Sequence, residues 1–229
     1  MHGTEGARLS GGEAVRAWVD GWVVSRGASP PFVEPWGFTV DVGQIKHPTR
    51  HVLAATGGDL HEADVRKVAA SVNGADVWLK AFDHADRVAP WLGPEWWVDP
   101  EPGYLMTVPL ARATPDRLIA PDGYRLRTWS RGGVVRAMLA TTDGAWVARG
   151  QIAPTGRTAV ADQIETSPEH RRKGLGSLIM RTLAAAAFEQ GAEFGVLAGT
   201  PDGRALYESL GWRVAAGLTS ARRKGPEES

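Results

Sequence analysis

The spacing of apolar and polar residues predicts a mixed α/β fold for the first part of the chain. Apolar residues recur at helical spacing over residues 12–25, and residues 36–42 alternate between apolar and polar as a strand does. Asp59, followed three residues later by Glu62, predicts an acidic capping box for a helix over residues 63–72. Further strands are expected over residues 51–55, 77–82 and 104–110.

A turn-rich stretch at residues 111–123 separates this part from one with a clearer pattern. It contains Thr-Pro-Asp and Ala-Pro-Asp-Gly, so we place a domain boundary there, between an N-terminal α/β half (residues 1–115) and a second unit (residues 116–229). The predicted order in the second unit is β-β-β-β-α-β-α-β. Its strands are expected over residues 124–129, 134–141, 145–153, 158–166, 194–198 and 212–218, its long helix over residues 169–190 before Gly191, and its short helix from Thr200-Pro201 to Gly211.

Composition and charge exclude several classes of function. The 229 residues include no cysteine, which removes disulfides, thiolate metal sites and a cysteine nucleophile. Lys plus Arg and Asp plus Glu both number 26, and a neutral chain lacks the basic surplus of a general nucleic-acid binder. The six histidines show no zinc-binding spacing, and no apolar run approaches the roughly 20 residues that span a bilayer. We therefore expect a cytoplasmic protein with no metal, no nucleic-acid partner and no membrane partner.

A basic, glycine-containing segment, Arg171-Arg172-Lys173-Gly174-Leu175-Gly176-Ser177, lies between the strand at 158–166 and the core of the long helix. Free backbone N–H groups at a helix start point outward with the positive end of the helix dipole, where they bind anions. The two glycines remove Cβ atoms that would block a diphosphate, the three basic residues add charge, and Ser177 can donate a hydroxyl hydrogen bond. The segment is a candidate phosphate-binding loop.

Other phosphate-binding motifs fit this segment poorly. It has no Gly-Lys-Ser/Thr, so it is not a Walker loop, and Ile179 stands where a dinucleotide fingerprint needs a third glycine. The remaining alternative is a solvated basic turn that contains two glycines.

Two motifs together resemble the GNAT superfamily of N-acetyltransferases. The loop matches its Arg/Gln-x-x-Gly-x-Gly/Ala signature, with Pro168 just upstream. About thirty residues later, Ala205-Leu206-Tyr207-Glu208-Ser209-Leu210-Gly211-Trp212 is similar to the second signature, Ala-x-x-Leu-Tyr-x-x-x-Gly-Phe. The resemblance covers residues 124–218. It implies the GNAT fold, an α/β (α+β) architecture with a central, mixed, mostly antiparallel sheet flanked by helices, and acetyl-CoA as co-substrate.

The resemblance also implies where acetyl-CoA binds. The strands at 158–166 and 194–198 are expected to splay apart, with the pantetheine arm in the gap beside Ile164 and Thr166. The diphosphate is expected on the loop, and Thr200, at the start of the short helix, is a further cofactor-binding candidate. The amine attacks the thioester directly, so no protein nucleophile is required.

Tyr207 matches the family tyrosine that protonates the departing thiolate, and a phenol with a pKa near 10 suits that role. The alternative is a structural tyrosine. Strand alternation places Val160, Asp162, Ile164 and Thr166 on one face, which makes Asp162 the first candidate for the general base and Glu165, on the other face, the second. A solvated carboxylate at Asp162 is the alternative, with water as the base or an acceptor that is already neutral.

The pattern departs from the family at the acceptor side. Only residues 130–133 separate the strands at 124–129 and 134–141, where the family carries two helices that form much of the acceptor site. We infer that the N-terminal half, a degenerate GNAT-like unit without the loop motif, closes that side. Eight of the ten tryptophans precede residue 130, and the Trp-rich stretch 91–104 forms either a wall of the acceptor pocket or a core between the halves.

The predicted function is transfer of an acetyl group to a primary amine of a small molecule or a peptide. The alternative is an acyl-CoA-binding regulatory protein without turnover. The acceptor, the acyl-chain preference and the oligomeric state, including a homodimer, stay open.

Overall fold

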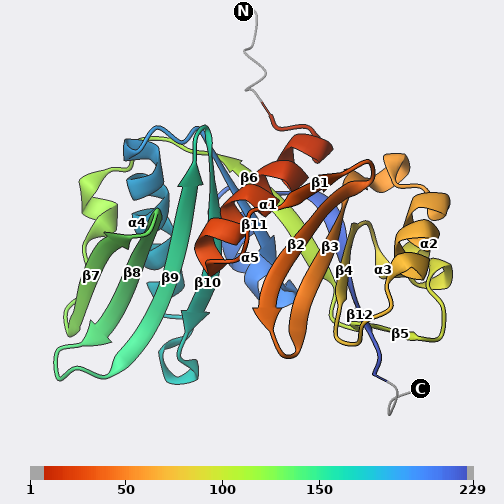
Figure 1. Ribbon diagram of the computed structural model, residues 1–229. Helices are drawn as coiled ribbons and strands as arrows, with labels where there is room; N and C mark the ends of the chain where they lie inside the picture. Colours follow the sequence, from red (N-terminus) through yellow and green to blue (C-terminus); the bar gives the residue numbers. More distant parts are fainter. Residues whose placement is uncertain (1–7, 226–229) are drawn as a thin grey trace, which may run out of the picture.

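The strands of the computed structural model, which describes residues 8–225, form one continuous sheet with helices on both faces (Figure 1). The predicted mixed α/β class is confirmed. The N-terminal half consists of α1 (Gly11–Arg26), β1 (Phe32–Glu34), β2 (Gly37–Gln44), β3 (His47–Thr56), η1 (Gly57–Asp59), α2 (Glu62–Ser71), β4 (Trp78–Phe82), α3 (Ala85–Val88), η2 (Ala89–Trp91), β5 (Trp96–Val98) and β6 (Gly103–Pro109).

The rest of the chain supplies the other part of the sheet. After η3 (Pro115–Leu118) come β7 (Tyr124–Arg131), β8 (Val134–Thr141), β9 (Trp146–Thr155), β10 (Thr158–Thr166), η4 (Pro168–His170), α4 (Leu175–Glu189), β11 (Phe194–Gly199), α5 (Pro201–Ser209) and β12 (Arg213–Arg223). The sheet order is β1-β2-β3-β4-β12-β6-β11-β10-β9-β8-β7, and β5 also pairs with β12.

The two halves repeat one succession of elements, so the N-terminal half is a second unit of the same architecture. In the first half β2 and β3 are antiparallel, and β3 and β4 are parallel through the α2 crossover. In the second half β9, β10, α4 and β11 follow the same scheme. A short helix and a last strand complete each half, as α3 with β6 and α5 with β12.

Each half gives its last strand to the other half. β6 pairs with β11, β12 pairs with β4, and β6 and β12 pair with each other at the centre of the sheet. The predicted boundary at residues 115/116 falls between β6 and β7, yet β6 lies between two strands of the downstream unit. The two halves therefore share one sheet.

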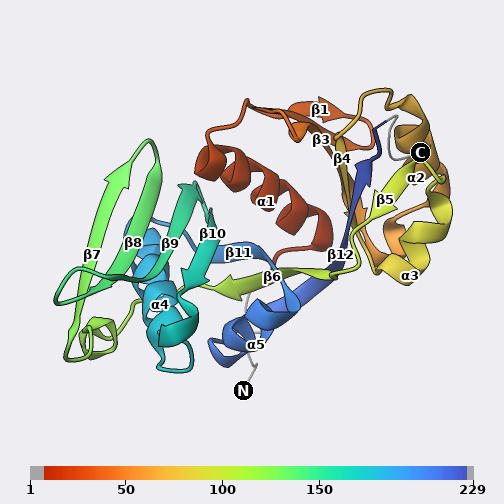
Figure 2. The ribbon, with the colours of Figure 1, turned by 90° about the horizontal axis from the view of Figure 1, so that it is seen from below.

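Helix α1 covers one face of the central strands, and α4 and α5 cover the opposite face (Figure 2). The side chains of Trp18 and Trp22 are buried among residues from both halves, including Val160. The backbone of α1 approaches β10 so closely that a Cβ added at Gly21 would lie 2.3 Å from Cγ2 of Val160. Because of this contact, α1 belongs to the second unit as much as to the first.

Two predicted helix starts are wrong. Asp59 does not cap α2: it lies in η1, and His61 is the N-cap residue without a side-chain hydrogen bond. The capping box occurs instead at α1, where Ser10 and Glu13 exchange hydrogen bonds. The long helix begins at Leu175, not at residue 169, because Pro168–His170 forms a separate 3-10 turn.

The Trp-rich stretch contributes mainly to the core of the first half. Trp96 is buried there, with Trp91 packed against the same cluster, whereas Trp97 is 37% exposed and lies edge-on to Trp78. Only Trp97 therefore remains a candidate for an outer wall.

A fragment of residues 116–229 should not fold, because it lacks β6 and with it the fully buried side chains of Leu105 and Met106. Losing even one such side chain costs about 2–5 kcal/mol, against a typical total stability of about 5–15 kcal/mol. Circular dichroism and gel filtration would test this, with the fragment co-expressed with residues 1–115 as the control. A soluble fragment that unfolds cooperatively would contradict the expectation.

Candidate active site

A gap opens between the two parallel strands β10 and β11. Their register runs from Thr158↔Phe194 to Val160↔Val196, although β10 continues to Thr166 and β11 to Gly199. Beyond Val160, the backbone N–H and C=O groups of β10 and β11 that face each other are therefore not hydrogen-bonded to one another. An extended ligand can pair with such an exposed strand edge.

A β-bulge reorients the end of β10. Asp162 pairs with Gln151 and Glu165 with Arg149, so one extra residue is accommodated between them, and Gln163 adopts a left-handed φ of 54°. The prediction that Val160, Asp162, Ile164 and Thr166 share one face is therefore wrong.

Before the bulge, Val160 packs in the cluster under α1; after it, Ile164 packs in the cluster under α4. The hydroxyl of Thr166 also lies on the α4 side, 3.4 Å from the Cβ position of Gly176. Both predicted pantetheine-binding residues thus lie on the side of the loop, whereas Asp162 faces α1.

The predicted phosphate loop has a backbone conformation suited to an anion. Arg172 and Gly174 both adopt left-handed φ values, of 63° and 75°. Gly174 caps α4 without a side chain, and the first helical hydrogen bond is donated by Leu178 to the Gly174 carbonyl at 3.1 Å. The N–H groups of residues 175–177 consequently have no partner within the helix. They form an anion-binding helix start.

Positive charge surrounds these N–H groups. Arg171, Arg172 and Lys173 are exposed, and Nε of Arg171 donates to the Thr166 carbonyl at 3.3 Å. That bond ties the loop to the end of β10. Thr200, predicted to bind cofactor, uses its hydroxyl to accept a hydrogen bond from Gly203 N at 3.3 Å as the N-cap of α5.

The Tyr207 ring is buried at the far side of the gap. It contacts Gly199 and Gly203, since a Cβ at either position would lie 2.9 Å from Cε2 of the ring, and it packs against Trp212 with 6.2 Å between ring centroids. Burial, with a smaller contribution from the negative charge of Asp162, raises the pKa of Tyr207 to about 12. The phenol is therefore protonated at neutral pH.

Asp162 is engaged by several donors. Its carboxylate accepts hydrogen bonds from Arg26 Nε at 2.6 Å, from Ser25 Oγ at 2.7 Å and from Gln163 N at 2.9 Å. Gln151 in turn donates to Ser25. Together these contacts hold the C-terminal end of α1 on β9 and β10. These donors would have to release the carboxylate before it could accept a proton from an ammonium group.

Glu165, the second candidate for the base, lies on the surface. It forms an ion pair with Arg149 of β9 at 2.9 Å, with both side chains more than half exposed. Sequence reasoning missed Ser25 and Arg26, because they lie 137 and 136 residues from Asp162 and carry no local signal. It also missed Gln151, whose partner Ser25 is 126 residues away.

The equivalent gap in the N-terminal half is closed. β3 and β4 pair from Arg50↔Trp78 to Val52↔Lys80 and, after an irregularity in the register, again at Thr56↔Phe82. The Arg87 guanidinium donates to the carbonyl groups of Gly57 and Leu60 and to Asp83. Glu62 and Asp64, exposed in the first turn of α2, would repel a phosphate at that helix start.

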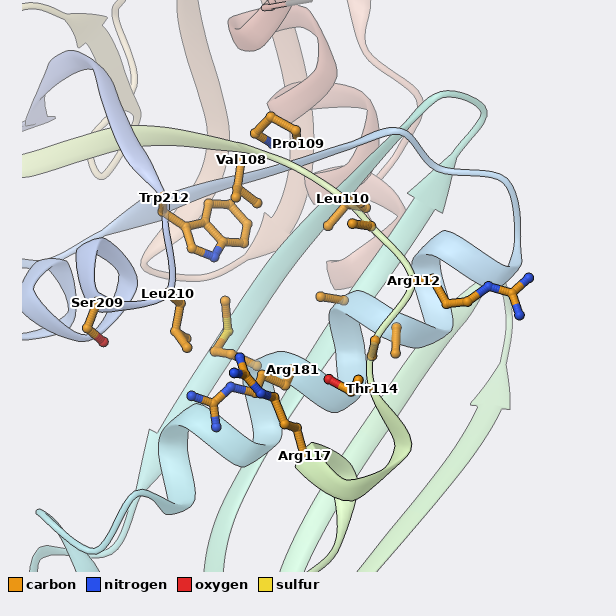
Figure 3. Close-up of a pocket in the computed structure, with 15 residues that line it drawn as sticks. Val108, Pro109, Leu110, Arg112, Thr114, Arg117, Arg181, Ser209, Leu210 and Trp212 are labelled. Atoms are coloured by element: carbon orange, nitrogen blue, oxygen red, sulfur yellow. The ribbon is translucent and has the colours of Figure 1, made fainter. Parts of the chain in front are cut away.

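A pocket of about 340 Å³ lies elsewhere, along the outer flank of α4 (Figure 3). Arg112, Arg117 and Arg181 line it, with Trp212 and Leu210 among its apolar residues. Neither Asp162, Tyr207 nor any residue of the phosphate loop contributes to it. It is separate from the gap between β10 and β11.

The family assignment follows from a comparison with protein-family models. The model described as the acetyltransferase (GNAT) family matches residues 91–212. The chain belongs to the GNAT family. Members of this family transfer an acyl group from acyl-CoA, and the matched segment contains the gap, the loop and Tyr207. No curated protein matches the sequence.

Solved structures show the same fold at low sequence identity. A GNAT protein from Kribbella flavida has a TM-score of 0.63 at 18% identity, covering 96% of this chain and 98% of its own. A GNAT-family protein from Novosphingobium aromaticivorans has a TM-score of 0.55 at 19% identity, covering 93% and 97%. A tandem GNAT protein from the clavulanic acid biosynthesis pathway has a TM-score of 0.53 at 13% identity, covering 95% and 98%.

Membrane-spanning helices and metal-binding clusters are both absent from residues 8–225. No helix there is long and apolar enough to cross a membrane. The same residues include no group of three or more His, Asp or Glu side chains arranged to hold a metal ion.

The GNAT chain should bind one CoA molecule, because only the C-terminal gap is open and basic. Isothermal titration with CoA should give one site per chain. Replacing both Arg171 and Lys173 with Glu should weaken binding at least tenfold, since the helix start then faces two new negative charges. Lys67→Glu on α2 is the control and should leave the affinity unchanged. Two sites per chain would show that the N-terminal gap opens.

Proposed function

We propose that this GNAT protein transfers an acetyl group from acetyl-CoA to a primary amine of a small molecule or peptide, by direct attack on the thioester. The observation that supports it best is the gap beyond Val160↔Val196, which has the anion-binding loop on one side and the Tyr207 ring on the other. A cytoplasmic location stays a prediction of the sequence, and neither nucleic acid nor a membrane takes part in the proposed reaction.

In this proposal the loop at 171–177 binds the diphosphate of acetyl-CoA through its free N–H groups. The pantetheine arm then follows the free edge of β10 near Ile164 and Thr166, pairing with it as an added strand. The thioester reaches the end of the gap, where the acceptor approaches from the α1 face. Attack by the amine forms a C–N bond, and collapse of the tetrahedral intermediate breaks the C–S bond.

Tyr207 donates its phenolic proton to the departing thiolate. Its raised pKa keeps the proton in place until charge develops on sulfur, which is the condition for a general acid. Asp162 serves mainly as a positioning residue, because it fixes α1 above the gap. The acceptor loses its ammonium proton to water or arrives neutral. After the attack its nitrogen releases one more proton to water, and the Tyr207 phenolate regains a proton from solvent.

A regulatory acyl-CoA-binding protein is the second candidate. The engagement of Asp162 by Arg26 and the exposure of Glu165 favour it, since neither carboxylate is free to act as a base. A thiol reagent distinguishes the two functions: the chain has no cysteine, so any thiol that forms in the presence of acetyl-CoA and an amine comes from CoA. CoA binding without thiol release over a broad amine panel would favour the regulatory function.

Tyr207→Phe should lower kcat by about 100-fold, the usual contribution of a general acid, with little change in CoA affinity. In the wild type the rate should rise with pH as the amine deprotonates and should not fall again below about pH 11, because the active form of Tyr207 is the protonated one and its pKa is about 12. Tyr124→Phe is the matched control, with kcat expected within about twofold of wild type. An equal kcat for Tyr207→Phe would remove the residue from the mechanism.

Asp162→Asn should mainly reduce stability, by about 1–3 kcal/mol, because it weakens the charged hydrogen bonds that hold α1. Its kcat should fall less than tenfold, and Glu165→Gln should change neither property. Thermal unfolding and pH–rate profiles measure both effects. A loss of more than 100-fold with unchanged stability would instead identify Asp162 as the general base.

A further inference from the structure

One buried and one partly buried cation lie on the sheet face that α1 covers, both contributed by the N-terminal half. Arg50 is on β3 and is 8% exposed, and Lys80 is on the adjacent strand β4, where it pairs with Val52. On its other side Lys80 pairs with Ser220 of β12. The two side chains therefore belong to one cluster at the junction of the halves.

Neutral groups account for the recorded contacts of these cations. Nε of Arg50 donates to Nε2 of His47 at 3.2 Å, and its guanidinium lies 3.9 Å from the ring centroid of Trp22. Nζ of Lys80 donates to Ser220 Oγ at 2.6 Å and lies 4.6 Å from the ring centroid of Trp78. Within residues 8–225, neither cation has a carboxylate at ion-pair distance.

The cluster carries more positive than negative charge. Burial, followed by repulsion from Arg26, lowers the pKa of Arg50 to about 9; burial and repulsion from Arg50 lower the pKa of Lys80 well below its usual range. Asp162 and Asp99 oppose these shifts, but Asp162 is already paired with Arg26. Burial also lowers the pKa of His47 to about 3, so its ring is neutral and can accept from Arg50. A bound anion would relieve this repulsion and stabilise the charged forms of both side chains.

The Arg50 guanidinium is not completely sealed from solvent. Among the described residues, two side-chain polar atoms are fully buried and have no hydrogen-bond partner: Nε1 of Trp96 and Oγ1 of Thr182. The terminal nitrogens of Arg50 also have no hydrogen-bond partner in residues 8–225, but they are not fully buried. They keep contact with solvent although the residue as a whole is buried.

The cluster lies on the acceptor side of the gap. The negative charge of Asp162 raises the pKa both of Arg50 and of Tyr207, so Asp162 is within electrostatic range of the cations and of the proposed general acid. Arg50 stacks on Trp22 of α1, and Lys80 pairs with Val52, whose side chain packs in the cluster under α1. Helix α4, at whose start the phosphate loop lies, is on the opposite face of the sheet (Figure 2). A group bound by these cations would belong to the acceptor and not to CoA.

We propose that the acceptor amine carries a carboxylate and that Arg50 and Lys80 bind it. The proposal rests on the proposed acetyl transfer. The planar guanidinium fork matches the two oxygens of a carboxylate, and Lys80 adds a point charge beside it. The Trp22 and Trp78 rings offer apolar walls for the carbon chain between the carboxylate and the amine.

Matched pairs of amines test the proposal with the whole protein. With acetyl-CoA, kcat/KM should be at least tenfold higher for 4-aminobutyrate than for 1-aminobutane, and for phenylalanine than for phenethylamine. A third comparison measures kcat/KM with an aminoalkyl phosphate as the acceptor. Higher activity with the phosphate than with either carboxylate, or equal activity with the uncharged amines, would overturn the proposal.

Variants link the preference to the two cations. Lys80→Met and Arg50→Gln should raise KM for the carboxylated amine at least tenfold, with kcat within about twofold, and should leave the uncharged amine unaffected. Lys67→Met, on exposed α2, is the matched control. If Arg50→Gln does not fold, the more accessible Lys80→Met carries the test. An unchanged KM in Lys80→Met would contradict the assignment.

A binding measurement separates this proposal from the proposed function. Butyrate and phenylacetate carry the carboxylate but no amine, so calorimetry with these acids reports the anion site without turnover. Binding that Lys80→Met weakens at least tenfold supports the site even if no amine is acetylated. Turnover of amines without a carboxylate preference would overturn the anion site while leaving acetyl transfer intact.

Discussion

The pairing of β6 with β12 at the centre of the sheet is the contact on which the rest of the molecule depends. Each strand ends one half of the chain and completes the sheet of the other. Neither half can close its own sheet alone, so the two fold as one cooperative unit. β11 is paired along its length with β6, a strand from the first half. This pairing fixes β11 on one side of the gap between β10 and β11.

In the proposed reaction, helix α1 of the first half takes the place of the substrate helices that the second half lacks. The helix spans the junction, and Asp162 fixes its C-terminal end through Arg26 and Ser25. The link between β7 and β8 is residues 132–133, which leaves no room for a helix there. The proposal therefore bounds the acceptor side with α1 and with side chains of β3 and β4, so that the donor and acceptor sides come from different halves.

Local sequence patterns correctly predicted those elements whose bounds depend on neighbouring residues. β8 and β10 have their predicted bounds, and Thr200 caps α5 with Pro201 at its first turn, because alternation and capping depend on neighbouring residues. The start of α4 was misplaced because nothing in the sequence around Arg172 signals its left-handed backbone.

Features that depend on contacts distant in sequence could not be predicted from it. The bulge at Gln163 arises where β10 diverges from β11, and the ion pair between Arg26 and Asp162 joins residues 136 positions apart. The exchange of β6 and β12 likewise leaves no periodic signal. The two signatures predict the donor residues from local sequence, whereas the proposed acceptor side depends on strands from both halves and has no local signature.

The Arg87 guanidinium in the closed N-terminal gap has a consequence for how the molecule responds to its ligand. In that half Arg87 bonds the carbonyl groups of Gly57 and Leu60, and these contacts form without a bound molecule. The helix start at Leu175 instead presents N–H groups that have no partner within the helix and that a bound anion would satisfy. In the proposed function, ligand binding therefore stabilises the second half of a duplicated architecture. The first half is held by its own side chains, so its acceptor-facing residues can change without disturbing the donor site.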